Sequence, residues 1–345
     1  MINKRPAAAI FMILAAVSGK TLAANQHLHH ETGHALHPGH EPIGVMGAHI
    51  HHEGNWMFSY RWMRMEMEGN RAGTDRLGTA GVLGQGYSVA PERMTMDMHM
   101  FGAMYGVSDD LTLILMLPWL DTEMEHVTGM GGGFTTEADG VGDVTLGALY
   151  RLGQWGSHQL HLNAGLGLPT GSIDERDDTP MGADQHLPYP MQTGSGTYDI
   201  LPGITWLGAA ADLSWGAQAL ATIRLGENDN DYTLGDRYRL TAWVSRQGMS
   251  GWGASLRLDV QWWDDIEGRD SELAPMMAMM VPTADPDLRG GERLDLLLGL
   301  SFSPVDGAFK GHRLAAEWGR PLHQDLNGPQ LETDWSLTLG WQYPL

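Results

Sequence analysis

The chain ends with Trp335-Ser336-Leu337-Thr338-Leu339-Gly340-Trp341-Gln342-Tyr343-Pro344-Leu345. Apolar or aromatic residues occupy its odd positions, and small or polar residues occupy its even positions from 336 to 342. This period of two predicts a β-strand with one apolar and one polar face. The strand is long enough to cross a bilayer and carries aromatic residues at both ends of its apolar face. These features indicate the closing strand of a transmembrane β-barrel.

The same alternation recurs along the chain. It predicts further strands that begin near residues 56, 93, 111, 144, 160, 198, 215, 238, 252, 294 and 314. With the last strand the count is about twelve, and bacterial barrels have even counts. Short connections near residues 107–110, 153–157, 208–212 and 247–251 alternate with long ones near 68–92, 123–142, 169–196 and 264–292. We predict an all-β fold, a transmembrane antiparallel up-and-down barrel, rather than a soluble sandwich or solenoid.

The N-terminus predicts export. Lys4 and Arg5 precede a short apolar run from Ala7 to Val17, and Thr21-Leu22-Ala23 offers small residues at a cleavage site. This pattern is typical of a secretory signal peptide. We expect residues 1–23 to be the signal peptide, 24–55 a periplasmic tail or plug, and 56–345 the barrel in the cell outer membrane.

Composition limits the partners. The chain has 21 basic and 42 acidic residues, so nucleic acid is excluded as a partner. It has no Cys, which excludes thiolate metal sites and disulfides. We expect outer-membrane lipid and small solutes or metal ions as partners.

Histidines gather before the barrel. Nine of the chain's 16 histidines lie between residues 24 and 55. Imidazole is a good ligand for Cu and Zn, and His-rich tracts often bind these metals. The alternative is a polar linker. No cofactor is required, and the candidate metal ligands of this tail are His27, His29, His30, His34, His37, His40, His49, His51 and His52.

Ionisable groups on the strands should face the lumen, because they are costly on a lipid face. Such a wall could attract anionic or polar solutes, or its charges could pair and fill a narrow barrel. The predicted pore-lining residues are Arg61, Arg151, Arg224, Arg237, Arg239, Arg257, Asp259, Asp295, Arg313 and Glu317.

Methionines form the second unusual group. Two runs on neighbouring strands should lie side by side near the outer rim. Thioether sulfur suits Cu(I), although methionine is also flexible apolar filling. The face of the second run stays open, since Phe101 and Tyr105 favour a luminal position and Asp97 and His99 oppose it. The candidate ligands are Met63, Met65, Met67, Met94, Met96, Met98 and Met100.

Several motifs resemble one family of outer-membrane barrels. They are residues 43–49 (IGVMGAH), 56–65 (WMFSYRWMRM), 92–100 (ERMTMDMHM), 141–143 (VGD), 168–172 (LPTGS) and 190–197 (PMQTGSGT). The family is labelled "putative MetA-pathway of phenol degradation" and is transporter-like. The resemblance implies an outer-membrane location and passage of small, including aromatic, compounds. Members with His- and Met-rich stretches also resemble companions of copper-resistance systems.

We therefore expect a channel or transporter-like barrel for small solutes that is linked to heavy-metal, especially copper, handling. The alternatives are an uptake barrel for small aromatic or hydrophobic compounds and a non-conducting structural barrel. We expect no enzyme, because no Ser–His pairing occurs on the predicted lipid-facing wall.

Overall fold

Eleven antiparallel strands close into a barrel within residues 41–345, the part of the chain that the computed structural model describes. Each pairs with its neighbours in the chain, and the last pairs with the first, so the topology is up-and-down. The predicted fold class is confirmed. The strands are β1 (Trp56–Gly73), β3 (Val89–Ser108), β4 (Leu111–Thr128), β6 (Val144–Trp155), β7 (His158–Leu168), β11 (Gly203–Ala210), β12 (Leu213–Leu225), β14 (Arg237–Gln247), β15 (Trp252–Trp263), β17 (Gly291–Phe302) and β18 (Arg313–Pro344).

The strand β18 supplies two adjacent passes of the wall. Its first part pairs with β17 as far as Leu326, and its second part pairs with β1 from Leu326 to Pro344, both in antiparallel register. Because β1 and β17 run in opposite directions, the chain must reverse within β18. The Gln324 side chain donates to the carbonyl of Thr333 and accepts from its N–H, each at 2.9 Å, across this reversal. The wall therefore has about twelve passes, as predicted.

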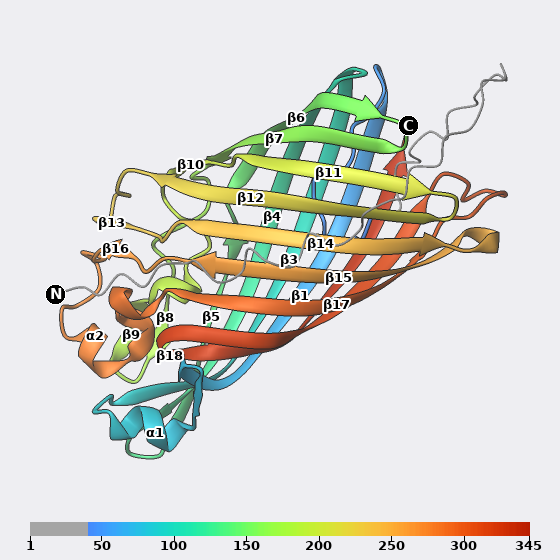
Figure 1. Cartoon of the computed structure of the whole chain (residues 1–345). Helices are drawn as coiled ribbons and strands as arrows, with labels where there is room; N and C mark the ends of the chain where they lie inside the picture. The colour runs from blue at the N-terminus through green and yellow to red at the C-terminus, as the bar shows by residue number, and fades with distance from the viewer. Residues whose placement is uncertain (1–40) are drawn as a thin grey trace, which may run out of the picture. The chain divides into compact units, whose positions relative to one another are not determined.

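Shorter elements extend the loops (Figure 1). Most of them, including α1, α2 and the paired strands β8–β9 and β13–β16, gather at the end opposite the C-terminus. We call this the loop end and the other the turn end, which by the rule for bacterial barrels is periplasmic. The elements are β2 (Asp75–Leu77), α1 (Thr79–Gly84), β5 (Gly133–Val141), β8 (Arg176–Thr179), β9 (Gly182–His186), η1 (Tyr189–Met191), β10 (Tyr198–Ile200), β13 (Tyr232–Thr233), η2 (Met249–Gly251), β16 (Glu267–Gly268), α2 (Met277–Met280), η3 (Pro282–Ala284) and η4 (Pro286–Leu288).

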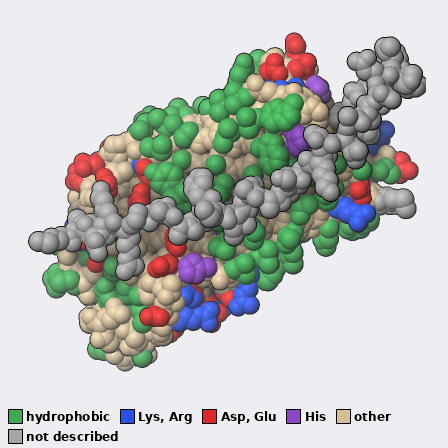
Figure 2. Space-filling view, in the orientation of Figure 1, with side chains coloured by type: hydrophobic (Ala, Val, Ile, Leu, Met, Phe, Trp, Pro, Cys, Tyr) green, Lys and Arg blue, Asp and Glu red, His purple; other side chains and the backbone are tan. Residues whose placement is uncertain are grey.

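The outer face of the barrel is apolar where a bilayer would surround it. Leu298 and Leu300 on β17 are 53% and 61% exposed, and Leu113, Leu115 and Leu117 on β4 are also exposed. Figure 2 shows hydrophobic side chains over the visible wall and charged ones mostly toward its two ends. A closed barrel with such a band is a transmembrane barrel of the outer-membrane type.

Two predicted loops are partly strand, which corrects the sequence reading. Residues 123–142 form a hairpin in which β4 continues to Thr128 and pairs with β5. The outward leucines of β4 are replaced there by carboxylates such as Glu123 and Glu125, while Met124 stays buried. The alternation continues, but with a polar outer face, because this part of the strand lies beyond the bilayer. Residues 68–92 likewise begin and end as extensions of β1 and β3.

No helix in residues 41–345 is long and apolar enough to cross a membrane.

A charge on the apolar band should destabilise the barrel. Leu298→Arg places a guanidinium near the middle of β17 and should lower the free energy of unfolding by about 2–4 kcal/mol. Phe309→Arg is the control, because Phe309 is exposed in the turn that precedes β18 and its change should cost less than about 1 kcal/mol. Urea unfolding in lipid vesicles measures both. Equal stability of the two variants would contradict the assignment of the apolar band.

Candidate functional site: the barrel lumen

Residues 41–55 are here called the luminal segment; residues 41–51 are buried or half-buried inside the barrel, and residues 52–55 are exposed. Its main-chain carbonyls accept hydrogen bonds from wall side chains: Ile43 O from Arg61 Nε at 3.0 Å, and Met46 O from Gln218 Nε2 at 3.0 Å. Further bonds of this kind come from Asn163 and His161 to Gly47 O and from Arg313 to Glu41 O, and His51 N donates to Thr112 Oγ1. These partners belong to strands around the whole barrel, so the segment crosses its interior.

Apolar side chains of the luminal segment are buried against the wall. Val45 and Ala48 pack with Leu207 and Trp243. In the same way, Ile50 packs with Met57, Met104 and Leu149. Hydrophobic contact thus adds to the main-chain hydrogen bonds, and together they hold the segment in the lumen.

Gly44 lies where a larger residue would force the neighbouring side chains to move. A Cβ atom at this position would stand 2.4 Å from Glu317 Oε1 and 2.5 Å from Arg257 Nη2. The luminal segment can therefore pass close to Arg257 and Glu317 at this glycine, because a hydrogen in place of a side chain leaves room for the ion pair.

Three titratable residues of the luminal segment lie together. The rings of His49 and His51 are 4.8 Å apart, and His49 Nδ1 lies 3.5 Å from Glu41 Oε2. Burial, together with the neighbouring His49, lowers the pKa of His51 to about 3. Burial alone would raise the pKa of Glu41, but His49 and Arg313 stabilise the carboxylate and lower that pKa to about 2.

A connected set of charges covers one side of the lumen. Arg257 is central: its Nε donates to Glu317 Oε2 at 3.2 Å, and its Nη1 lies 3.3 Å from Asp259 Oδ1. The same carboxylate oxygen accepts from Arg239 Nε at 2.7 Å, and Gln261 donates to the other oxygen of Asp259. These buried charges are therefore paired and hydrogen-bonded, as burial requires.

The remaining predicted pore residues differ in their surroundings. Arg224 pairs with Asp199, and Asp295 pairs with Arg293. Arg151 Nε lies 3.6 Å from Oδ1 of Asp110, and Asp110 is in the short turn between β3 and β4. Arg237 is exposed and has no ion pair within residues 41–345. Buried members of the set are Arg61, Arg257, Asp259, Asp295, Arg313 and Glu317, while Arg151, Arg224 and Arg239 are half-buried.

The opposite side of the lumen is covered by methionines, here called the methionine wall. In the register of β1 and β3, Met63 lies opposite Met98, and Met67 lies opposite Met94. Arg61, which binds the luminal segment, is on the same face, so the open question about this run is answered: it is luminal. The wall comprises Met57, Met63, Met65, Met67, Met94, Met96, Met98, Met100, Met104, Met116 and Met124.

The loop-end part of the methionine wall forms a buried cluster. Met94 and Met124 lie opposite each other on β3 and β4 and are 3% and 1% exposed. Leu187 and Met191, from the loop that carries β8 and β9, pack against them. This loop therefore folds inward over the outer part of the lumen, as the luminal segment does from the other end. Met124, placed in a loop by the sequence prediction, is a strand residue.

Some charged groups face outward, contrary to prediction. Arg64 forms an ion pair with Asp97, and Tyr60 Oη lies 2.7 Å from His99 Nδ1, on the face that carries the aromatic residues. Arg64 also lies over the Trp62 ring. Pairing and cation–π contact lower the cost of an outward charge near the edge of the apolar band.

The described residues contain no preformed metal-binding site of His, Cys, Asp or Glu side chains. In residues 41–345 no group of three His, Cys, Asp or Glu side chains is placed to hold a metal ion. His52 is exposed and contacts Asp109 at 3.0 Å. The other predicted tail ligands (His27, His29, His30, His34, His37 and His40) and the signal peptide lie outside the described residues.

Sequence reasoning missed the polar residues that bind the luminal segment. Gln218, Asn163 and Thr112 are uncharged and occur singly on strands, so nothing in the sequence separated them from other polar luminal residues. The signal that was available is their position: each lies on the polar face of an alternating strand.

The fold and lumen define a class: an outer-membrane β-barrel with the architecture of a channel. A family model described as "Putative MetA-pathway of phenol degradation" matches residues 74–272, more than half of the chain. The chain therefore belongs to this family, and the resemblance found in its motifs is confirmed.

Solved structures agree on the fold. The COG4313 outer membrane channel from Pseudomonas putida F1 superposes with a TM-score of 0.59 at 16% identity, covering 88% of this chain and all of that one. A Pseudomonas aeruginosa FadL homologue (TM-score 0.39, 11% identity, 84% and 89% covered) and the KdgM porin (0.38, 10%, 83% and 98%) are too distant to support an argument. The search of curated proteins found no match.

Acidification should release the luminal segment. The pKa values of His51 and Glu41 in the lumen lie below their ordinary values of 6.5 and 4.5. Their contribution to holding the segment in the lumen is complete above pH 6.5 and is lost as pH falls. The equilibrium between the held and the released segment should shift by up to about ten-fold per pH unit between 6 and 4. Single-channel recording from pH 7.5 to 4 should show rising open probability.

The matched variants are His51→Gln, which cannot titrate, and His52→Gln, whose side chain is 76% exposed. We expect the first to flatten the pH dependence and the second to retain it. A pH response that is the same in both variants and the parent would refute the role of His51.

Proposed function

We propose that this protein is an outer-membrane channel for small solutes and that the luminal segment is its inner gate. The observation that supports the gate best is that the wall is hydrogen-bonded without it. Gln218 Nε2 donates to Thr205 Oγ1 at 2.9 Å, and Thr205 Oγ1 donates to Asn163 Oδ1 at 2.7 Å. Arg257 and Glu317 bind each other. The segment can therefore leave the lumen while these buried groups keep their hydrogen-bond partners. Water can take the place of the segment at the other wall groups that bond to it.

The two sides of the lumen indicate the kind of solute. The methionine wall offers flexible apolar contact, and the opposite side offers hydrogen-bonding groups whose charges are mostly cancelled within the protein. Among the predicted pore-lining arginines of β12, β14 and β15, Arg224, Arg239 and Arg257 are ion-paired and Arg237 is not. We therefore propose small amphipathic solutes that are neutral overall, which includes aromatic compounds, and a weak preference for anions set by Arg237.

Opening should follow removal or displacement of the luminal segment. Deletion of residues 24–50 should raise the single-channel conductance in planar bilayers, because the interior is then filled by water. Gly44→Ala should raise the open probability about five-fold or more, since its methyl overlaps Arg257 and Glu317 and such overpacking costs about 1–3 kcal/mol.

Gly84→Ala is the matched control, because a Cβ there meets nothing within 4 Å. It should conduct like the parent. If the deletion and Gly44→Ala both conduct like the parent, the proposed gate is wrong, and if none of these proteins conducts, the barrel is a non-conducting structural one.

Copper handling is the second candidate, supported by the arrangement of thioethers. Met67, Met94 and Met124 occupy one row across three adjacent strands and pack in one cluster. Neighbouring residues in such a row have Cβ atoms about 5 Å apart, and thioethers are soft ligands for Cu(I). We propose that this row binds a soft monovalent ion during passage.

Replacement by leucine separates thioether chemistry from packing. The triple change of Met67, Met94 and Met124 to Leu keeps an apolar cluster and should abolish Ag(I) binding in calorimetry and raise copper sensitivity of cells. Leucine at Met276 and Met279, which are 63% and 67% exposed at and within the short helix α2, is the control. Unchanged Ag(I) affinity in the triple variant would exclude this row as a metal site.

A further inference from the structure

The lipid-facing wall has an apolar groove of about 590 Å³ at the turn end. Its lining comes from five adjacent passes of the wall, namely β15, β17, both passes of β18 and β1, and from at most three consecutive positions on each. Neighbouring strands lie about 4.8 Å apart, so four spacings give the groove a length of about 19 Å. The groove is therefore long and narrow, which is the shape of a hydrocarbon chain rather than of a compact solute.

A small residue among large ones makes the groove. Ala316 lies between Leu314 and Trp318 on the outward face of β18 and directly opposite Leu300 of β17. These three neighbours are 54%, 45% and 61% exposed, so large apolar side chains stand around a single methyl group. An empty hollow would leave its lining without contacts on one side. The groove is continuous with the apolar band, where the surrounding material is hydrocarbon, so an acyl chain is the occupant that fits it.

A positioned hydrogen-bond donor lies at the turn-end edge of the groove. His312 Nδ1 accepts from the indole N–H of Trp341 at 3.0 Å, and Trp341 lines the groove. The indole nitrogen can only donate, so the imidazole is neutral and carries its proton on Nε2. The imidazole ring is also stacked on Tyr343, with centroids 4.3 Å apart. These two contacts fix the ring, and Nε2 is left as a donor with no hydrogen-bond partner in the described part of the chain.

The same turn carries a second donor. Lys310 is exposed, forms no ion pair among the described residues and is the only lysine of that part of the chain. Main-chain hydrogen bonds from Lys310 N to Gly307 O and from His312 N to Phe309 O fold the turn that holds both donors. Ammonium and imidazole N–H groups are good donors to a phosphate. Asp306 of this turn balances the lysine charge, so the turn suits a zwitterionic headgroup.

We propose that the groove binds one phospholipid of the periplasmic leaflet, with an acyl chain over Ala316 and the headgroup phosphate at His312 and Lys310. The turn end is periplasmic by the rule for bacterial barrels, and aromatic residues mark the level of the headgroups there. The bound lipid contacts β17, both passes of β18 and β1, so it covers the strands that close the barrel. This binding is independent of whether the lumen conducts.

Native mass spectrometry of the full chain, released from detergent micelles that contain increasing amounts of lipid, tests the acyl-chain position. Palmitoyl-oleoyl phosphatidylethanolamine should bind saturably at one site. Ala316→Leu should weaken this binding about ten-fold or more, because the leucine side chain fills the hollow. The variant should fold like the parent, since leucine is usual on the lipid-facing wall.

The headgroup position is tested with a second probe, the diacylglycerol that has the same two acyl chains but no phosphate. His312→Phe keeps an aromatic ring beside Tyr343 and removes the donor. It should weaken the phospholipid about three- to ten-fold, because one hydrogen bond is lost, and should leave the diacylglycerol unchanged. Lys310→Gln, which removes a charge from an exposed position, should act in the same way.

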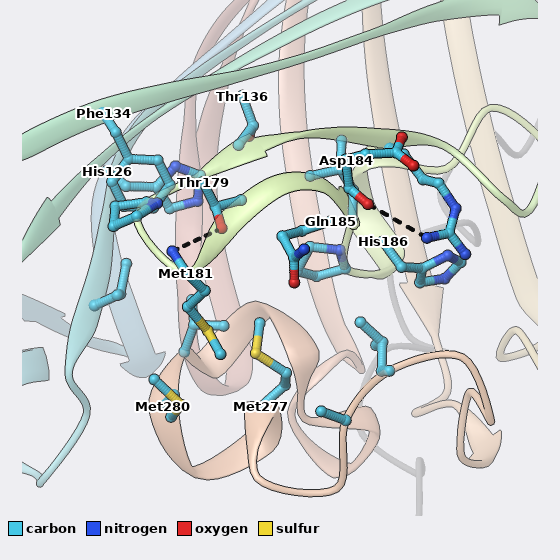
Figure 3. A pocket seen from close by; sticks show the side chains of 18 of the residues that line it. His126, Phe134, Thr136, Thr179, Met181, Asp184, Gln185, His186, Met277 and Met280 are labelled. Carbon is cyan, nitrogen blue, oxygen red and sulfur yellow. Dashed lines mark hydrogen bonds between the residues drawn. The ribbon is translucent and has the colours of Figure 1, made fainter.

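The loop-end cavity supplies the matched control for the change at Ala316. This cavity is another apolar hollow, and Figure 3 shows Met181, Met277 and Met280 in its wall, between the β8–β9 hairpin and α2. Ala274 lines it, so Ala274→Leu makes the same change away from the groove and should leave phospholipid binding unchanged.

Three results would overturn the proposal. The first is the absence of saturable phospholipid binding. The second is a phospholipid affinity that Ala316→Leu leaves unchanged or that Ala274→Leu lowers equally, which would place the lipid elsewhere. The third is a phospholipid affinity that both His312→Phe and Lys310→Gln leave unchanged.

Discussion

The requirement that no backbone hydrogen bond stay open in a bilayer governs this structure. Strands can meet it only when the sheet closes, which happens where the second pass of β18 pairs with β1. Closure assigns every strand side chain either to lipid or to the lumen. Because a barrel of about twelve passes is narrow, the luminal side chains must also find partners within a small space. The charge pairs, the methionine wall and the luminal segment are three ways of filling it.

The charged side chains of the lumen pair with one another and stabilise the barrel, whatever effect they have on solutes. Arg257 contacts Glu317 and Asp259, and Asp259 in turn contacts Arg239. Removing one member of such a buried set leaves an unpaired charge, at a cost of about 3–5 kcal/mol. The set is thus constrained to stay neutral overall, and this leaves little net charge to select ions. Only Gly44 permits the luminal segment to approach it, which links the position of the gate to the packing of the pair.

How much the sequence could predict depends on the distance between the interacting residues. Alternation is local, so it predicted the strands, the apolar face of residues 335–345 and the family. The prediction of the end of β4 failed beyond Trp119, where the outer face of the strand becomes acidic, because the prediction relied on lipid-facing leucines. It could not pair Asp199 with Arg224, nor bring His186 to Asp270, since such contacts arise from loop and barrel packing. The contacts between the loops were therefore invisible in the sequence, whereas the luminal charges were visible without their partners.

The choice of methionine for the lumen is informative because the same strand uses leucine elsewhere. On β4, Leu113, Leu115 and Leu117 are exposed outward, while Met116 and Met124 face inward. The luminal face of β4 also carries Ile114 and Leu120, opposite Met104 and Met98, so apolar filling there does not depend on methionine alone. Methionine adds flexibility and a sulfur that accepts weak hydrogen bonds. Met65 Sδ shows this, lying 3.9 Å from Arg293 Nη1 and 3.8 Å from Thr333 Oγ1. A wall of this kind can adapt its shape to an apolar ring and still accept a weak hydrogen bond from a polar group. It therefore suits a solute that is partly apolar better than one that is fully hydrated.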